Sequence, residues 1–373
     1  MMTESALEFQ ELKTASGDRI GVATLSAEEN LNAINLDMIE GLYRQLQDWR
    51  HNEHIACIWL EGAGGKAFCA GGDIIHLYQS MCDNPKGTNE YAEKFFSREY
   101  RLDYLIHNYP KPIICWGHGI TMGGGLGLMA GASHRVVTET SKIAMPEITI
   151  GLFPDVGATW FLNRMPTSIG LFLGLTGLNI NAEDALQVHL ADAFIPVDQK
   201  ENLCEGLKNM AWRSQESNHS QVSQLLYQIS RQYEHLKPSS LLAPHLSLIH
   251  RLSNLNSVEE VYSTLMQIET DDRWLKKGLD SLRDGCPTTA CLIWRQMHQL
   301  RGLTLKEVFC QELIMAIQCT RHPDFREGVR AQLIDKDKQP VWQHKFPGDV
   351  PESWINEFFD SPWKNGSHPL NDL

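Results

Sequence analysis

Residues 111–128 read KPIICWGHGITMGGGLGL, an apolar run that leads into a cluster of glycines. The apolar run predicts a buried strand, and glycines at the junction of a strand and a helix let a backbone N–H approach a ligand without a Cβ in the way. The N-terminus of the following helix adds positive potential at that point. The alternative is that Gly123, Gly125 and Gly127 serve only the tight packing of this helix against a sheet.

A second glycine cluster, EGAGGKAFCAGGD at residues 61–73, follows the apolar run IACIWLEG at residues 55–62. Neither cluster is a nucleotide-binding motif, because the Lys of GGKA lacks the following Ser or Thr and the spacing does not fit G-x-G-x-x-G in its usual context. Two backbone N–H groups that face one another, one from each cluster, would form an oxyanion hole.

The remaining pattern divides the chain near residue 200. In the first part, apolar runs that predict strands alternate with an amphipathic helix, which indicates a largely parallel sheet covered by helices. The strands are expected at 20–28, 55–62, 111–121 and 134–139, and the helix at 36–52. After residue 200 the pattern is helical, with segments at 201–215, 221–236, 258–270, 274–284, 291–302 and 305–319. We therefore predict an α/β core at 1–200 and a helical C-terminal region at 201–373.

Composition limits the classes of binding partner and the cellular compartment that we expect for this protein. The 373 residues carry a formal net charge of -13, which argues against a nucleic-acid backbone or an anionic membrane as partner. The nine cysteines include no C-x-x-C pair, which favours reduced thiols. No apolar run is long enough to span a membrane, and the first residues, MMTESALEFQELKT, lack the character of a signal or organellar presequence. We expect a soluble, cytoplasmic protein.

Two acids stand in the apolar stretch AMPEITIGLFPDVGATW at residues 144–160. Glu147 and Asp155 are eight residues apart, and Gly151 and Pro154 interrupt any helix between them, so a bent chain must bring the acids together. The plainer interpretation is that Asp155 caps a helix that starts near Val156 and that Glu147 is solvated.

Four motifs occur in one order along the chain: LNAIN at 31–35, AFCAGGD at 67–73, HGITMGGGLGL at 118–128 and MPEITIGLFPDVGATWFL at 145–162. In this order they resemble the crotonase superfamily, whose members bind acyl-CoA thioesters and polarise the thioester carbonyl with two backbone amides. The chain is most similar to the 3-hydroxyisobutyryl-CoA hydrolase branch, including the late segment DFREGVRAQLIDKDKQPVW at 324–342. The resemblance implies a crotonase-type ββα spiral core, followed by helices that cover the acyl end of the active site.

The resemblance also implies roles for particular residues. The oxyanion donors correspond to the N–H groups of Gly72 and Gly124. Hydratases carry a glutamate where this chain has Gly127, and the hydrolase branch carries an acid where this chain has Asp155. Glu147 then attacks the thioester carbonyl to form a mixed anhydride, or acts as general base on water, while Asp155 orients the hydroxyl or the water and shuttles a proton. Burial and mutual repulsion should raise the pKa of at least one of these acids.

Two further residues are expected to contact the substrate. Glu99 matches a family acid that lines the acyl pocket; the alternative is a surface acid paired with Arg98 or Arg101. Lys66 is placed to meet the nucleotide phosphates, although an exposed lysine is commonplace. We expect neither a metal nor a separate cofactor, because coenzyme A is part of the substrate.

The expected reaction is hydrolysis of 3-hydroxyisobutyryl-CoA to 3-hydroxyisobutyrate and CoA, a step of valine breakdown, with 3-hydroxypropionyl-CoA as an alternative substrate. Two rival interpretations stay open: another crotonase-fold activity, such as an enoyl-CoA hydratase or isomerase, and a non-catalytic acyl-CoA-binding protein. Assembly into a homo-oligomer is also open, because the enlarged helical region could replace the contacts that superfamily trimers use.

Overall fold

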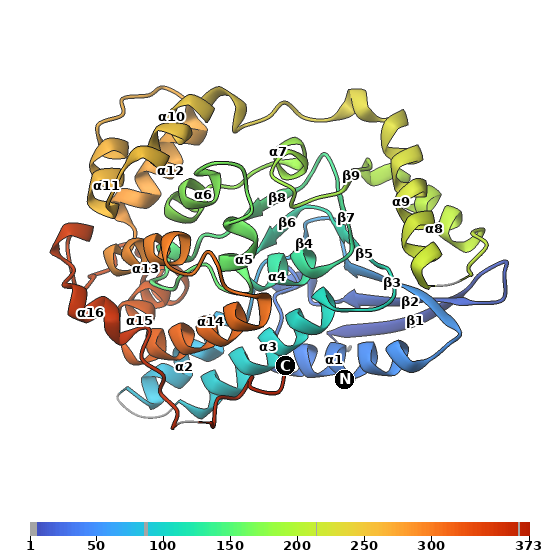
Figure 1. The fold of residues 1–373 in the computed structure, drawn as a ribbon, viewed down its shortest axis with the longest axis horizontal. Helices are drawn as coiled ribbons and strands as arrows, with labels where there is room; N and C mark the ends of the chain where they lie inside the picture. The colour runs from blue at the N-terminus through green and yellow to red at the C-terminus, as the bar shows by residue number, and fades with distance from the viewer. Residues whose placement is uncertain (1–5, 86–88, 214, 365) are drawn as a thin grey trace. The chain divides into compact units, whose positions relative to one another are not determined.

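The structure, a computed structural model, describes residues 6–85, 89–213, 215–364 and 366–373 (Figure 1). The first residues, for which the sequence predicts no presequence, include residues 1–5, which lie outside these ranges. The chain forms two compact units, each built from three segments. The first unit comprises 1–72, 102–143 and 180–242, and the second comprises 73–101, 144–179 and 243–373. Each unit takes residues from both sides of position 200, so the boundary expected there stays a prediction.

A six-stranded sheet forms the centre of the first unit, with strand order β1-β2-β3-β5-β7-β9. These strands are β1 (Leu7–Lys13), β2 (Arg19–Leu25), β3 (Ile55–Gly62), β5 (Ile113–Gly117), β7 (His134–Val137) and β9 (Ala193–Phe194). Strand β1 pairs with β2 in antiparallel orientation, and every pair from β2 to β9 is parallel. The largely parallel sheet expected from the sequence is confirmed.

A second, smaller sheet has the order β4-β6-β8. Its strands are β4 (Ala67–Cys69), β6 (Ile120–Met122) and β8 (Lys142–Ala144). The single strand expected at 111–121 was wrong, because the chain leaves the large sheet after β5 and enters the small sheet at β6. Gly119 makes this step possible: its φ is +58°, and a Cβ there would lie 2.2 Å from the carbonyl oxygen of Lys66.

Helices cover both faces of the large sheet (Figure 1). The helices of the first unit are α1 (Leu36–His51), α4 (Gly124–Gly131), α7 (Ala182–Gln187), α8 (Lys200–Lys208) and α9 (Gln215–Gln232). On one face, Ile20 and Val22 of β2 share an apolar cluster with residues of α8 and α9. On the other face, the ring of Trp49 from α1 lies over Gly21, where a Cβ would come within 2.8 Å of it. Because successive residues of β2 point to opposite faces of the sheet, Ile20 and Val22 face α8 and α9, whereas Gly21 faces α1.

The second unit is built mainly from helices. Helix α3 (Glu90–His107) begins in it and continues into the first unit. The others are α2 (Ile74–Asp83), α5 (Ala158–Leu162), α6 (Ile169–Thr176), α10 (Leu246–Arg251), α11 (Val258–Met266), α12 (Arg273–Asp284), α13 (Pro287–His298), α14 (Leu305–Arg321), α15 (Pro323–Val329) and α16 (Glu352–Glu357). Each helical segment expected after residue 200 coincides with a helix, but the one expected at 201–215 ends at Lys208, and residue 214 lies outside the described ranges. In the described ranges, no helix has the length and hydropathy needed to cross a bilayer.

Candidate active site

Three buried carboxyl groups come together in the second unit. Glu99 lies in α3, Glu147 begins a short 3-10 helix, η2 (Glu147–Thr149), and Asp155 lies in the loop before α5. Their exposed fractions are only 2%, 5% and 4%. The charges of Glu147 and Asp155 both raise the pKa of Glu99, and that of Asp155 raises the pKa of Glu147, so the three groups share one electrostatic environment. The bent chain expected between the two acids of the loop is confirmed.

Asp155 does not cap a helix. Its main-chain oxygen accepts a hydrogen bond from Ala158 N at 2.8 Å, and Gly157 occupies the N-cap position of α5. The side chain instead accepts a hydrogen bond at Oδ2 from the Tyr100 hydroxyl, at 2.7 Å. Burial raises the pKa of Asp155 to about 6, although this hydrogen bond acts in the opposite direction. The carboxyl therefore titrates close to the pH range in which a general acid or base is effective.

Glu147 is buried with one oxygen unsatisfied. Among the described residues, its Oε2 has no hydrogen-bond partner. Burial first, and the charge of Asp155 second, raise the pKa of Glu147 well above its ordinary value. The expectation of a raised pKa for at least one of the acids is confirmed. A desolvated carboxylate with a free oxygen is a stronger base and nucleophile than a hydrated one.

Glu99 is a buried residue of α3 and not a surface acid. Burial is the largest cause of its raised pKa, followed by the charges of Asp155 and Glu147. Its neighbour Arg101 points elsewhere, since its guanidinium donates to the carboxylate of Asp372 at 2.6 Å and to the carbonyl of Pro369 at 2.9 Å. The interpretation of Glu99 as an exposed acid paired with Arg101 was therefore wrong.

The two glycines expected to form the oxyanion hole both lie in the first unit. Gly72 follows β4, and Gly124 is the first residue of α4, which follows β6. Strands β4 and β6 are parallel neighbours, so both glycines stand just beyond the carboxyl ends of adjacent strands. In parallel sheets this edge is where ligands bind. The convergence of their two N–H groups on one oxygen stays a prediction.

The packing role considered for the neighbouring glycines applies to Gly125. A Cβ at this position would lie 2.3 Å from the carbonyl oxygen of Cys69, so only glycine lets α4 approach β4 this closely. Lys66 directly precedes β4 and is exposed, and its main-chain oxygen accepts a hydrogen bond from Ile120 N at 3.0 Å. The exposed ammonium is compatible with an anionic ligand, and its phosphate-binding role stays a prediction.

Three residues around Asp155 were not recognised in the sequence: Tyr100, Gln296 and Glu312. Tyr100 follows Glu99 directly in α3. The sequence shows that the two residues are neighbours, but it does not show that the Tyr100 hydroxyl points to Asp155. Gln296 and Glu312 are fully buried in α13 and α14. A glutamate inside the apolar stretch QELIMAI of α14 was the one signal that could have singled out Glu312, because a buried acid must have partners.

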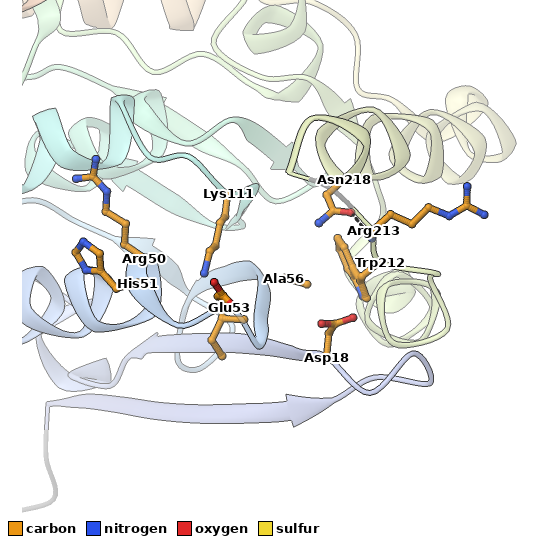
Figure 2. Close-up of a pocket in the computed structure, with 10 residues that line it drawn as sticks. Asp18, Arg50, His51, Glu53, Ala56, Lys111, Trp212, Arg213 and Asn218 are labelled. Carbon is orange, nitrogen blue, oxygen red and sulfur yellow. Dashed lines mark hydrogen bonds between the residues drawn. The ribbon is translucent and has the colours of Figure 1, made fainter.

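A cavity of about 180 Å³ is lined by residues of the first unit and by none of the three acids (Figure 2). Charged residues line it, but the side-chain ends of Arg50, Lys111 and Arg213 do not converge on one point. Lys111 is already satisfied, since its Nζ donates to the carbonyl oxygens of Trp49 and Asn52 at 2.6 Å, at the end of α1. This lysine therefore neutralises the negative end of a helix and is not held ready for a ligand.

Comparison with known proteins identifies the family of the chain. A family model described as "Enoyl-CoA hydratase/isomerase" matches residues 20–359. The 3-hydroxyisobutyryl-CoA hydrolase, mitochondrial, of Danio rerio is 37% identical over 345 residues, which cover 92% of this chain and 87% of the relative. The human protein of the same name is 36% identical over 91% of this chain and 86% of its own length.

Solved structures are similar over almost the whole chain. An enoyl-CoA hydratase from Rhodobacter sphaeroides superposes with a TM-score of 0.82 at 29% identity, covering 96% of this chain and 98% of that structure. A carnitinyl-CoA dehydratase from Mycobacterium thermoresistibile also gives a TM-score of 0.82, at 27% identity, covering 94% of this chain and 96% of that structure. These neighbours confirm the crotonase-type α/β fold with its helical C-terminal region. The chain belongs to the enoyl-CoA hydratase/isomerase family.

Proposed function

We propose that the protein is an acyl-CoA thioester hydrolase that converts 3-hydroxyisobutyryl-CoA and water to 3-hydroxyisobutyrate and CoA, a step of valine degradation. The observation that carries this proposal is the buried pair Glu147 and Asp155, in a chain whose relatives at 34–37% identity are named 3-hydroxyisobutyryl-CoA hydrolase. The pKa of Asp155, which burial raises to about 6, supports proton transfer by this group near neutral pH.

In the proposed reaction, the Glu147 carboxylate attacks the thioester carbonyl carbon, and the N–H groups of Gly72 and Gly124 stabilise the negative oxygen that forms. The C–S bond then breaks, and the CoA thiolate leaves and takes a proton from Asp155. Water adds to the resulting anhydride, gives a proton back to Asp155 and releases the hydroxy acid together with the Glu147 carboxylate. In the alternative, Glu147 acts as general base and water attacks the thioester directly.

We assign Glu99 to the substrate hydroxyl and Lys66 to the nucleotide phosphates. A protonated Glu99 could donate a hydrogen bond to the hydroxyl, which its raised pKa favours. Acyl-CoA is thus the small-molecule partner, and no cofactor enters the scheme because coenzyme A leaves with the substrate. We also assign the protein to the cytoplasm, with its nine free cysteines reduced, and leave homo-oligomer formation as a further alternative. The printed name "mitochondrial" applies to the relatives.

The enoyl-CoA hydratase of Rhodobacter sphaeroides, with its TM-score of 0.82, favours hydration of an enoyl-CoA as the second candidate. Gly127 opposes it, because no carboxyl group is present where the resemblance places a hydratase glutamate. A thioester hydrolase releases a free thiol, whereas a hydratase does not. Thiol release therefore separates the two candidates in a single assay.

The experiment measures free CoA released from 3-hydroxyisobutyryl-CoA, 3-hydroxypropionyl-CoA and crotonyl-CoA by the purified protein. We expect the highest kcat/KM for the first substrate. Glu147→Gln and Asp155→Asn should each lower kcat by about 10³-fold or more while CoA still binds, because each removes a reacting group and not a binding contact.

Asp184→Asn is the control for these two variants. Asp184 is a fully buried carboxyl of the first unit, and it accepts hydrogen bonds from the amides of Leu241 and Leu242. This variant tests the loss of a buried carboxyl that belongs to the first unit and not to the acid group of the second unit. Wild-type turnover in both Glu147→Gln and Asp155→Asn would remove these residues from the mechanism, and no thiol release from any hydroxyacyl-CoA would refute the hydrolase.

A further inference from the structure

The turn that follows Asp155 has a strained backbone. Val156 has a φ of 52° and Gly157 a φ of 87°. A positive φ is rare for a β-branched residue and typically costs on the order of 1–3 kcal/mol, so it persists only where surrounding groups hold the chain in place. The direction of the Asp155 carboxyl therefore depends on whatever fixes this turn.

Glu312 of α14 provides the first set of fixing contacts. Its Oε2 accepts a hydrogen bond from Gly157 N at 2.7 Å, and its Oε1 accepts one from Thr159 N at 2.9 Å. Gln296 of α13 provides the second set, since its Nε2 donates at 2.8 Å both to the carbonyl oxygen of Pro154 and to Thr159 Oγ1. The chain is thus held on both sides of Asp155.

A carboxyl group at position 312 is unfavourable for stability alone. Glu312 is fully buried, and this burial raises its pKa, while the N–H groups of Thr159 and Gly157 act in the opposite direction and favour the ionised carboxylate. A glutamine of the same shape could accept only one of the two N–H groups, because its Nε2 is itself a donor. Two acceptor oxygens on one rigid group are what this turn requires.

We propose that Glu312 is a positioning residue: its carboxylate holds the turn at residues 156–159 and thereby directs the Asp155 carboxyl, to which Tyr100 donates. The inference deepens the proposed function, on which its effect on turnover rests. Glu312 makes its contacts with main-chain amides, and it acts through Asp155. Its removal should therefore affect the chemical step more than substrate binding.

The test compares Glu312→Gln with the wild-type protein in the CoA-release assay. The glutamine keeps the size of the side chain, but its Nε2 is a donor and would face the N–H group of Gly157 or Thr159, which is also a donor. We expect kcat to fall by about 10- to 100-fold with KM changed by less than about three-fold, because a displacement of about 1 Å at a reacting group has an effect of this size. Hydrogen exchange followed by mass spectrometry should show faster exchange of the amides at 157–159.

Asp184→Asn is the control, because it also replaces a buried carboxyl that accepts from main-chain amides, namely those of Asn181, Leu241 and Leu242, in addition to the Ser240 hydroxyl. It should keep wild-type kcat and wild-type exchange at 157–159. Wild-type kcat in folded Glu312→Gln, or a loss shared equally by Asp184→Asn, would overturn the inference. If Glu312→Gln does not fold, Glu312→Asp decides, since it keeps the charge but is one methylene too short to reach both N–H groups, and wild-type kcat in that variant overturns the inference. If the wild-type protein releases no CoA, the proposed function fails, whereas unchanged exchange at 157–159 refutes the role of Glu312 whatever the substrate is.

Discussion

Burial of Glu99, Glu147 and Asp155 lowers the stability of the folded protein at neutral pH. The pKa of Asp155 is raised from 3.8 to about 6, so its protonated form favours the folded state. The stabilisation is complete below the unfolded pKa of 3.8 and is lost as the pH rises through about 6. The same direction applies to Glu99 and Glu147, whose pKa values are also raised. Reactive acids are thus kept at the expense of folding free energy.

Asp155→Asn should therefore gain stability relative to the wild-type protein as the pH rises. The side chain at 155 no longer titrates, and the repulsion of the other two acids is also relieved. Between pH 4 and pH 8 we expect the difference in free energy of unfolding to shift in favour of the variant by up to about 3 kcal/mol, from about two pKa units. Urea unfolding at several pH values measures this shift. A difference that does not change with pH would mean that Asp155 is already ionised at pH 4.

The loop that carries Glu147 is shaped by a helix that lies far along the chain. Gly328 of α15 packs on the backbone of Ile150, where a Cβ would lie 2.3 Å from the Ile150 carbonyl carbon. Ile150 N in turn donates to the main-chain oxygen of Glu147 at 3.0 Å. Gly151 makes the reverse contact, since a Cβ there would lie 2.5 Å from the Asp324 carbonyl oxygen. Gly151 and Gly328 thus allow α15 to pack closely against the loop that contains η2.

Gly328→Ala should lower both stability and turnover. Alanine in a helix is ordinarily more stable than glycine by about 1 kcal/mol, but here the added Cβ meets main-chain atoms that cannot rotate away. We expect a loss of about 1–3 kcal/mol in unfolding free energy and a reduced kcat, because Ile150 must move and Glu147 with it. The control is Gly302→Ala, which has nothing within 4 Å of the added Cβ. A Gly328→Ala protein with higher stability and wild-type kcat would show that η2 does not depend on this contact.

Across the whole molecule, the sequence predicted what depends on local pattern. The strand at 55–62 matches β3 because its residues form one apolar run, and the acids Glu147 and Asp155 were found because prolines and glycines surround them. The contacts of Glu312 with the turn could not be predicted from local pattern. Glu312 lies 155 positions after Gly157 and 153 positions after Thr159 in the chain. The separation of β5 from β6 was also missed, because the polar His118 and the flexible Gly119, which interrupt the apolar pattern, were included in one predicted strand.

The division near residue 200 can be tested directly, because the change in sequence pattern there falls within the first unit. The apolar cluster on one face of the large sheet includes Leu203, Leu207, Val222 and Leu226 from α8 and α9. A fragment of residues 1–200 would leave this face of the sheet in water, with the buried Trp59 and Trp116 exposed. We expect the fragment to aggregate or to lack a cooperative urea transition, whereas the full chain unfolds cooperatively. A soluble fragment of 1–200 with a sharp transition would instead establish residues 1–200 as an independent domain, with α8 and α9 as an addition that the sheet does not require.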